Sequence, residues 1–185
     1  MQYELTTPCT AADLAPLKAG DTVLLSGVVY TARDQAHRRM LEALDKDEKL
    51  PFDLEGSAIY YVGPTPERPG EVIGSAGPTT SGRMDAMSPR LLDLGNKIMI
   101  GKGKRDAAVK EAVVRNGAVY LAALGGAGAL MAQSVKTLEV IAWPDLGCEA
   151  VRRLTVEKMP LMVILDAHGG DLYTSGPAAY LETVK

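Results

Sequence analysis

Short runs of β-branched and other apolar residues alternate with helix-like segments along most of this chain, and this alternation is the strongest constraint on its fold. Runs typical of buried strands cover residues 22–30, 58–62, 97–101, 118–124, 139–143 and 161–166. Helix-like spacing or capping signals cover residues 34–44, 88–94, 105–116 and 129–135. Alternating strands and helices are typical of parallel pairing, so the sequence predicts an α/β fold with at least some parallel strands.

Nothing in the sequence divides the chain, and we expect one domain over residues 1–185. The apolar fraction of 46% and the charged fraction of 23% are typical of a globular protein. A net charge of -3 argues against nucleic-acid binding, which needs Lys and Arg concentrated on one face. No run approaches the roughly 18 apolar residues of a membrane helix, and the first residues lack a secretory signal. We therefore expect a cytoplasmic protein with neither a nucleic acid nor a membrane as partner.

The two cysteines, Cys9 and Cys148, lie far apart in the sequence and belong to no CxxC or Cys/His cluster. A [4Fe-4S] cluster is generally held by three or four thiolates, so this chain cannot assemble one alone, and we predict no metal ligands in it. Free cysteines are often interior, and we expect both to be small buried residues.

Residues 77–85, with the sequence GPTTSGRMD, form the first candidate site. A Gly- and Pro-rich segment favours a loop, and this loop presents the hydroxyls of Thr79 and Thr80, the guanidinium of Arg83 and the carboxylate of Asp85. These groups suit a small anion. The alternative is a plain surface turn.

Residues 30–39 form the second candidate site, at a junction between a strand and a helix. Arg33 could bind a carboxylate beside the helix N-terminus, and Asp34 is expected at the N-cap. His37, one turn later, is either a proton carrier or a residue that orients Asp34 or Arg33. Arg38 and Arg39 are expected to face water.

Residues 100–106 form the third candidate site, in which Lys102 is flanked by two glycines that would let a ligand approach the backbone. Lys102 offers a compact charge for a carboxylate or phosphate, whereas Lys104 and Arg105 are expected to face water. The segment lacks Walker A spacing. The glycines of residues 125–128 are interpreted as a tight turn, and His168 as structural.

Each of these three segments follows a predicted strand and offers a cation. Two or more cations suit a dicarboxylate, but the chain has no electrophile or metal site of its own. The sequence therefore indicates one half of an active site.

These motifs, together with Leu146-Gly147 and residues 149–151, resemble the β subunit, or C-terminal domain, of class I iron-sulfur hydro-lyases, the fumarase and L-tartrate dehydratase group. The resemblance covers nearly the whole chain. It implies a swivelling β/β/α domain and a hetero-oligomer in which a partner α subunit supplies three cysteines to a [4Fe-4S] cluster with one open iron. The isolated chain could form a homodimer.

The resemblance also implies reversible hydration of a small dicarboxylic acid, with fumarate/malate as the expected pair and the open iron as Lewis acid. By the matching motifs, Arg33, Arg83, Lys102 and Thr80 would bind substrate, and Thr79 would move the C3 proton. Asp34, His37 and Asp85 would support them; Asp34, Asp85 or a partner residue could activate Thr79. The alternatives are an L-tartrate dehydratase β subunit, a stand-alone dicarboxylate-binding module, and the small subunit of an aconitase-like isomerase, against which residues 77–80 argue.

Overall fold

The computed structural model describes residues 1–123 and 126–183. Leu124, the last residue of the predicted strand 118–124, and Gly125, the first glycine of the predicted turn 125–128, lie outside the described residues. Val184 and Lys185 lie outside them as well. The predictions for these positions therefore have no structural counterpart here.

Four parallel strands form the centre of the sheet, in the order in which they occur along the chain. They are β2 (Thr22–Thr31), β3 (Ala58–Tyr60), β4 (Ile98–Gly101) and β5 (Val119–Ala122). A further strand, β1 (Gln2–Thr6), pairs in parallel with the first half of β2, before the residues of β2 that pair with β3. The parallel pairing predicted from the alternating sequence pattern is confirmed, and all four carboxyl ends of β2–β5 meet at one edge.

A long antiparallel strand closes this sheet into a five-stranded barrel. Strand β7 (Val151–Leu165) pairs with β2 along most of its length and with β5 near its end. Strand β6 (Val135–Ala142) pairs with β7 outside the barrel. The domain is thus mixed α/β with a closed barrel and two extra strands.

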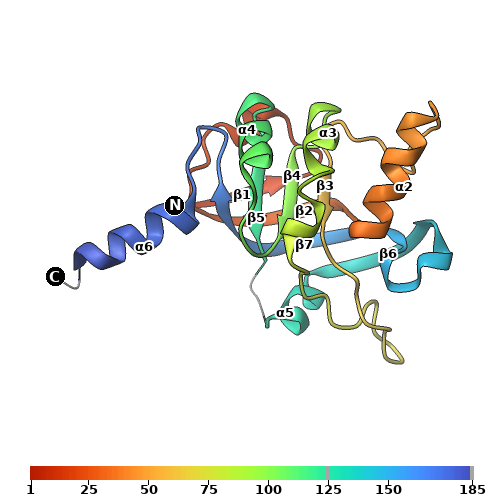
Figure 1. Ribbon diagram of the computed structural model, residues 1–185. Coiled ribbons are helices and arrows are strands. Elements are labelled where there is room, and N and C mark those ends of the chain that lie inside the picture. Colours follow the sequence, from red (N-terminus) through yellow and green to blue (C-terminus); the bar gives the residue numbers. More distant parts are fainter. Residues whose placement is uncertain (124–125, 184–185) are drawn as a thin grey trace.

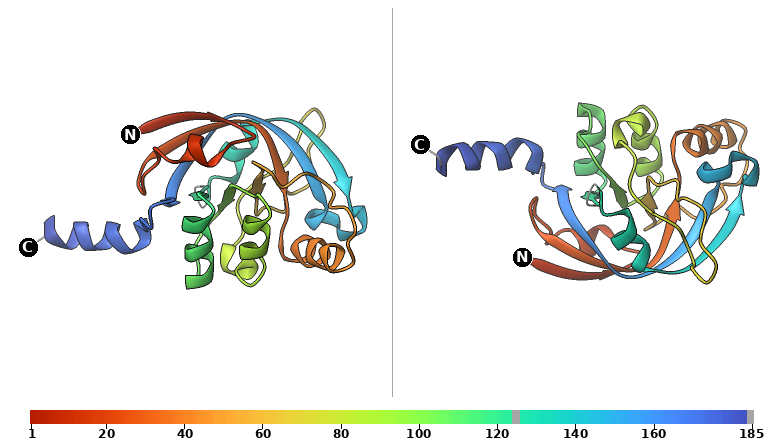
Figure 2. Two further views of the ribbon diagram at one scale, coloured as in Figure 1. Left: turned by 90° about the horizontal axis from the view of Figure 1, so that it is seen from above. Right: turned by 90° about the horizontal axis from the view of Figure 1, so that it is seen from below.

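Three helices lie in a row on the outside of the barrel: α2 (Asp34–Asp45), α3 (Ser88–Asp93) and α4 (Ala107–Arg115), as Figure 2 shows. The short helices are α1 (Ala11–Leu14), α5 (Gly128–Gln133) and the 3-10 helices η1 (Ser81–Met84) and η2 (Pro144–Glu149). Helix α6 (Leu172–Thr183) projects away from the body (Figure 1). Within the described ranges, no helix has both the length and the apolar composition needed to cross a membrane.

The core has two parts, one on each side of the barrel wall. One cluster draws side chains from all five barrel strands, and the other combines strand residues with the buried faces of α2, α3 and α4. Along β3, Tyr60 belongs to the first cluster and Ile59 to the second; along β4, Ile100 and Met99 divide in the same way. Burial on both faces explains why these short strands are continuously apolar.

Most predicted elements are present, with shifted boundaries. Helix α2 begins at Asp34 and its N-cap is Arg33, so the prediction of Asp34 as N-cap is wrong. Gly117 follows α4 with φ of 57°, in the left-handed conformation that glycine favours after a helix. The predicted strand 139–143 begins earlier, because Val135 already pairs with Val156.

Candidate active site

The three candidate segments reach the same edge of the sheet, at the carboxyl ends of β2, β3 and β4. Arg33 lies two residues after β2, and Lys102 directly follows β4. Thr79 is distant from β3 in sequence, but its backbone N–H donates to the carbonyl of Tyr61, which follows β3, at 2.8 Å. The carboxyl ends of strands are the usual position of ligand sites in α/β proteins.

The turn that carries Thr79 and Thr80 is bonded directly to the loop that carries Lys102. Thr80 and Lys102 form an isolated parallel bridge, and the N–H of Ser81 donates to the carbonyl of Lys102 at 2.9 Å. The N–H of Lys102 donates in turn to Ser81 Oγ at 3.0 Å. Two of the predicted segments are therefore held at a fixed spacing.

Gly101 makes this close approach possible. A Cβ at this position would lie 2.0 Å from Ser81 Oγ and 3.0 Å from Tyr61 Cδ2. The sequence interpretation assigned the glycine to an approaching ligand, but at Gly101 the approaching group is a neighbouring segment of the same chain.

Two cations of the site are open to solvent. The side chains of Arg83, on η1, and Lys102 are exposed, and neither forms an ion pair within the part of the chain that the structure describes. Thr80 is exposed and Thr79 is half-buried. The edge thus offers two uncompensated positive charges and two hydroxyls, a set that suits an anion with two carboxylates.

Arg33 is held differently from these two cations, because it is largely buried and paired. Its side chain is 19% exposed, and Nη2 lies 3.3 Å from Glu149 Oε1 and 3.8 Å from Asp34 Oδ1. The other oxygen of Glu149 accepts from the N–H of Gln35 at 3.0 Å, in the first turn of α2. Glu149 therefore fixes the arginine and the helix N-terminus together. Sequence reasoning assigned no role to Glu149, although it lies within a matched motif.

His37 is fully buried beneath this junction. Its Nδ1 lies 2.9 Å from the carbonyl oxygen of Arg33, and its ring packs edge-on against Tyr61 at 5.3 Å between centroids. Burial lowers the pKa of His37 to about 4, so the imidazole is neutral near pH 7. Of the two roles considered from the sequence, this placement fits the orienting one, because the ring contacts the backbone of Arg33.

Arg105 is buried, so the prediction that it faces water is wrong; Lys104 is exposed as predicted. Arg105 Nε donates to Asp85 Oδ1 at 2.6 Å, and the guanidinium side chain is 0% exposed. Asp85 Oδ2 accepts from the N–H of Asp106 at 2.7 Å. Both oxygens of Asp85 thus accept hydrogen bonds from residues 105 and 106. These structural bonds occupy the carboxylate that the sequence suggested as a possible activator of Thr79.

Tyr120 contacts both the turn that carries Ser81 and the loop that carries Gly103. Its hydroxyl lies 2.9 Å from Ser81 Oγ and 3.0 Å from the carbonyl oxygen of Gly103. Burial raises the pKa of Tyr120, so the phenol keeps its proton and can donate. Sequence reasoning interpreted Tyr120 only as a strand residue, because its partners lie far away in the sequence.

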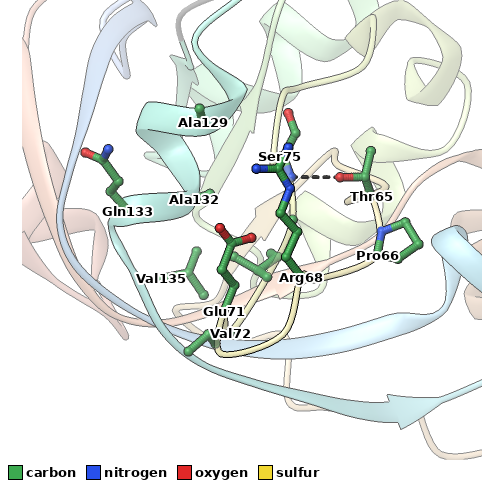
Figure 3. Close-up of a pocket in the computed structure, with 12 residues that line it drawn as sticks. Thr65, Pro66, Arg68, Glu71, Val72, Ser75, Ala129, Ala132, Gln133 and Val135 are labelled. Atoms are coloured by element: carbon green, nitrogen blue, oxygen red, sulfur yellow. Dashed lines mark hydrogen bonds between the residues drawn. The ribbon is translucent and has the colours of Figure 1, made fainter.

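A cavity of about 440 Å³ opens beside the site, between the 65–75 loop and α5 (Figure 3). Its lining includes Arg68, Glu71 and Gln133, which the figure shows around the opening. None of the predicted site residues lines it. Gly128, the first residue of α5, packs so closely against the 65–75 loop that a Cβ would meet Ser75 Oγ at 2.3 Å.

The cysteines differ from each other in their surroundings. Cys9 is buried, and burial raises the pKa of its thiol to about 11, whereas Cys148 is exposed and the prediction of burial is wrong there. Among residues 1–123 and 126–183, no three His, Cys, Asp or Glu side chains are grouped closely enough to hold a metal ion. The donor set of this chain does not fit an iron-sulfur cluster.

The remaining polar residues predicted to be structural or solvated have ordinary contacts. Arg38 is exposed, and Arg39 is partly exposed and pairs with Asp145 in η2. His168 lies in the turn between β7 and α6, with Nε2 2.7 Å from the carbonyl oxygen of Ala15.

Comparison with known proteins gives consistent matches. The family model described as Fumarase C-terminus matches residues 1–176. A protein of Methanocaldococcus jannaschii, named provisionally as an L(+)-tartrate dehydratase subunit beta, is 43% identical over 89% of this chain and 87% of its own length. The Escherichia coli L(+)-tartrate dehydratase subunit beta is 33% identical over 98% of this chain and 92% of its own length.

Fumarate hydratases match over a smaller part of their own chains. The aerobic class I fumarate hydratase of Escherichia coli is 37% identical over 88% of this chain. The matched region is 30% of that enzyme. The chain therefore spans nearly all of the tartrate dehydratase beta subunits but about a third of the fumarate hydratases.

Proposed function

Because the chain belongs to the family described as Fumarase C-terminus, we propose that it is the β subunit of a two-chain hydro-lyase that adds or removes water on a small dicarboxylic acid. The observation that supports this proposal is that the segments carrying Arg33, Arg83, Lys102 and the two threonines reach one edge of the sheet. The swivelling motion implied by the family resemblance is part of the proposal, with the closed barrel as the body that moves.

The three cations have different proposed roles in binding the substrate. Arg83 and Lys102, which are exposed and lie on two bonded loops, would bind one or both carboxylates directly, with Thr80 contributing a hydroxyl. Arg33 would complete the pocket from the β2 end, with its guanidinium held by Glu149. Because Arg33 is already paired with Glu149, the two uncompensated charges of Arg83 and Lys102 would favour a dianion over a monoanion.

Thr79 is the proposed proton-transfer residue. Its backbone N–H binds the carbonyl of Tyr61 beside β3, which fixes the backbone that carries its hydroxyl. A threonine hydroxyl is a weak base at its free pKa, and activation would have to come from its surroundings in the closed complex. Because both oxygens of Asp85 bind Arg105 and Asp106, we assign the activating group to the partner or to Asp34.

Any iron-sulfur cluster would be contributed by the partner subunit, because the cysteines of this chain do not fit one. Fumarate/malate and L-tartrate are the two substrate candidates, and the names of the relatives include both. A substrate panel with fumarate, malate and both tartrate enantiomers distinguishes them.

The test is anaerobic reconstitution. The purified chain should contain no iron and should not hydrate fumarate or dehydrate tartrate alone. Addition of a cluster-bearing α chain from the same organism should restore activity on one substrate pair. If no such mixture is active on any dicarboxylate, although the isolated chain binds one by calorimetry, a stand-alone binding module replaces the hydro-lyase subunit as the interpretation.

A further inference from the structure

The buried guanidinium of Arg105 joins the two loops that carry Arg83 and Lys102. We infer that Arg105 is a positioning residue, which sets the place of Arg83 relative to Lys102 without touching substrate. This inference rests on the proposed function of that edge.

The turn that carries Thr79 and Arg83 is fixed at three places. At its start, the N–H of Thr79 binds Tyr61 of the sheet, and in its middle Ser81 exchanges two hydrogen bonds with Lys102. At its end, Asp85 binds Arg105. Arg83 lies between the second and third places, and the third is held by the Arg105 side chain together with the N–H of Asp106.

All three nitrogens of the Arg105 guanidinium contact a neighbouring side chain. Nε donates to Asp85 at 2.6 Å, Nη2 donates to Ser88 Oγ at 2.9 Å, and Nη1 lies 3.3 Å from Met99 Sδ. The guanidinium also lies near two tyrosine rings, 5.3 Å from the centroid of Tyr61 and 5.0 Å from that of Tyr120.

These two tyrosines connect Arg105 to the other anchors of the site. The Tyr61 carbonyl accepts from Thr79, and the Tyr120 hydroxyl is bonded to Ser81 or Gly103. A lysine would retain the positive charge, but its single ammonium lacks the planar fork of donors that contacts Asp85, Ser88 and Met99 together. Arg105→Lys should therefore loosen the Asp85 end of the turn, while the Thr79 end keeps its bond to Tyr61.

This difference between the two ends gives a specific kinetic expectation. In the reconstituted enzyme, Arg105→Lys should raise KM by roughly ten- to hundredfold, because Arg83 loses its fixed position. The value of kcat should change much less, because Thr79 remains anchored. Ser88→Ala, which removes only one of the three contacts, should raise KM in the same direction by a smaller factor.

Val113→Ala is the matched control, because it truncates a buried side chain on α4 away from the loops. It should lower thermal stability while leaving KM unchanged. If Val113→Ala raises KM as much as Arg105→Lys does, or if KM of Arg105→Lys equals that of the wild type, the positioning role is refuted.

Hydrogen exchange of the isolated chain gives a second readout that needs no activity. Arg105→Lys should accelerate exchange of amides in residues 82–85 and 103–106 relative to Val113→Ala, with residues 58–62 unchanged. A wild-type enzyme without activity on any dicarboxylate would overturn the proposed function, whereas unchanged exchange at both loops would overturn the role of Arg105.

Discussion

At the scale of single residues, Gly101, at the end of β4, is the position where any side chain would collide with Ser81 of the neighbouring turn. Gly101→Ala would place a methyl group 2.0 Å from Ser81 Oγ, in a region fixed on both sides by backbone hydrogen bonds. We expect a loss of about 1–3 kcal/mol in the free energy of unfolding, as for other overpacked sites. Chemical denaturation measures it.

Gly82 provides the matched control for this substitution. A Cβ there would meet its nearest atoms at 3.8 and 3.9 Å, which is ordinary contact, and its φ lies outside the left-handed region. Gly82→Ala should leave stability nearly unchanged. Equal stabilities of the two variants would contradict the close approach of Ser81 to Gly101.

His37 gives a prediction for the dependence of stability on pH. Its folded pKa of about 4 is below the unfolded value of 6.5, so the unfolded state binds a proton more readily. The stability that neutral His37 contributes is complete above pH 6.5 and is lost as pH falls toward 4. The total loss over this interval is about 3 kcal/mol.

Denaturation midpoints between pH 7 and 4 measure this effect. His37→Asn, whose amide can still donate to the Arg33 carbonyl, should lose distinctly less stability over the same interval. Parallel curves for the variant and the wild type would show that another group causes the decline.

Residue roles could be predicted from the sequence where the chemistry is local. The polar, glycine-flanked segments around Thr79 and Lys102 indicated an anion site, and both reach one edge of the sheet. The environment of Arg105 could not be predicted, because its partner Asp85 is 20 residues away and the adjacent Lys104 is exposed. A charged residue beside a helix start has no sequence signal that distinguishes a buried pair from a solvated one.

At the scale of elements, α2 and η2 are joined by two ion pairs with different surroundings. Glu149, whose side chain is 15% exposed, pairs with Arg33 and accepts from the first turn of α2; Asp145, 61% exposed, pairs with Arg39. Glu149→Ala should cost about 1–2 kcal/mol of stability, because it removes a helix cap as well as a charge.

Asp145→Ala serves as the control at the same pair of elements. An exposed ion pair contributes little, so the variant should lose less than about 1 kcal/mol. Thermal unfolding of both variants at one pH measures the difference. An Asp145 variant less stable than the Glu149 variant would contradict the anchoring role assigned to Glu149.

Strands differed in how clearly the sequence indicated them. The strands β3 and β4 are buried on both faces, so a continuous apolar run revealed them. Only the end of β7 was predicted, because residues 151–160 contain four charged side chains and Pro160. The buried Leu154 and Val156 alternate with exposed residues there, but two exposed residues separate Val156 from Met159, so the period-2 pattern was weak.

At the scale of the whole molecule, barrel closure depends on β7, which pairs with β2 on one side and β5 on the other. Closure brings together segments more than a hundred residues apart, and no local pattern encodes such pairing. The alternation of elements in the sequence predicted the α/β class, whereas the closed barrel could be recognised only in the structure.

Helix α6 gives a prediction at this scale. The helix projects from the body, and its residues 177–183 are exposed (Figure 1). Its first turn, in contrast, contacts the site: the N–H of Gly103 donates to the Tyr173 hydroxyl at 3.2 Å. Deletion of residues 177–185 should leave the melting temperature nearly unchanged, whereas Tyr173→Ala should lower it. A large loss of stability on deletion would show that the projecting part is bound to another surface.

The most direct test of the proposed function is the KM of Arg83→Ala in the reconstituted enzyme. Loss of one charged contact to a carboxylate should raise KM by roughly 10- to 150-fold with the melting temperature unchanged. Arg68→Ala, an exposed arginine of the neighbouring cavity, should leave KM at the wild-type value. A normal KM for Arg83→Ala, or a raised KM for Arg68→Ala alone, would place the substrate away from the edge formed by β2, β3 and β4.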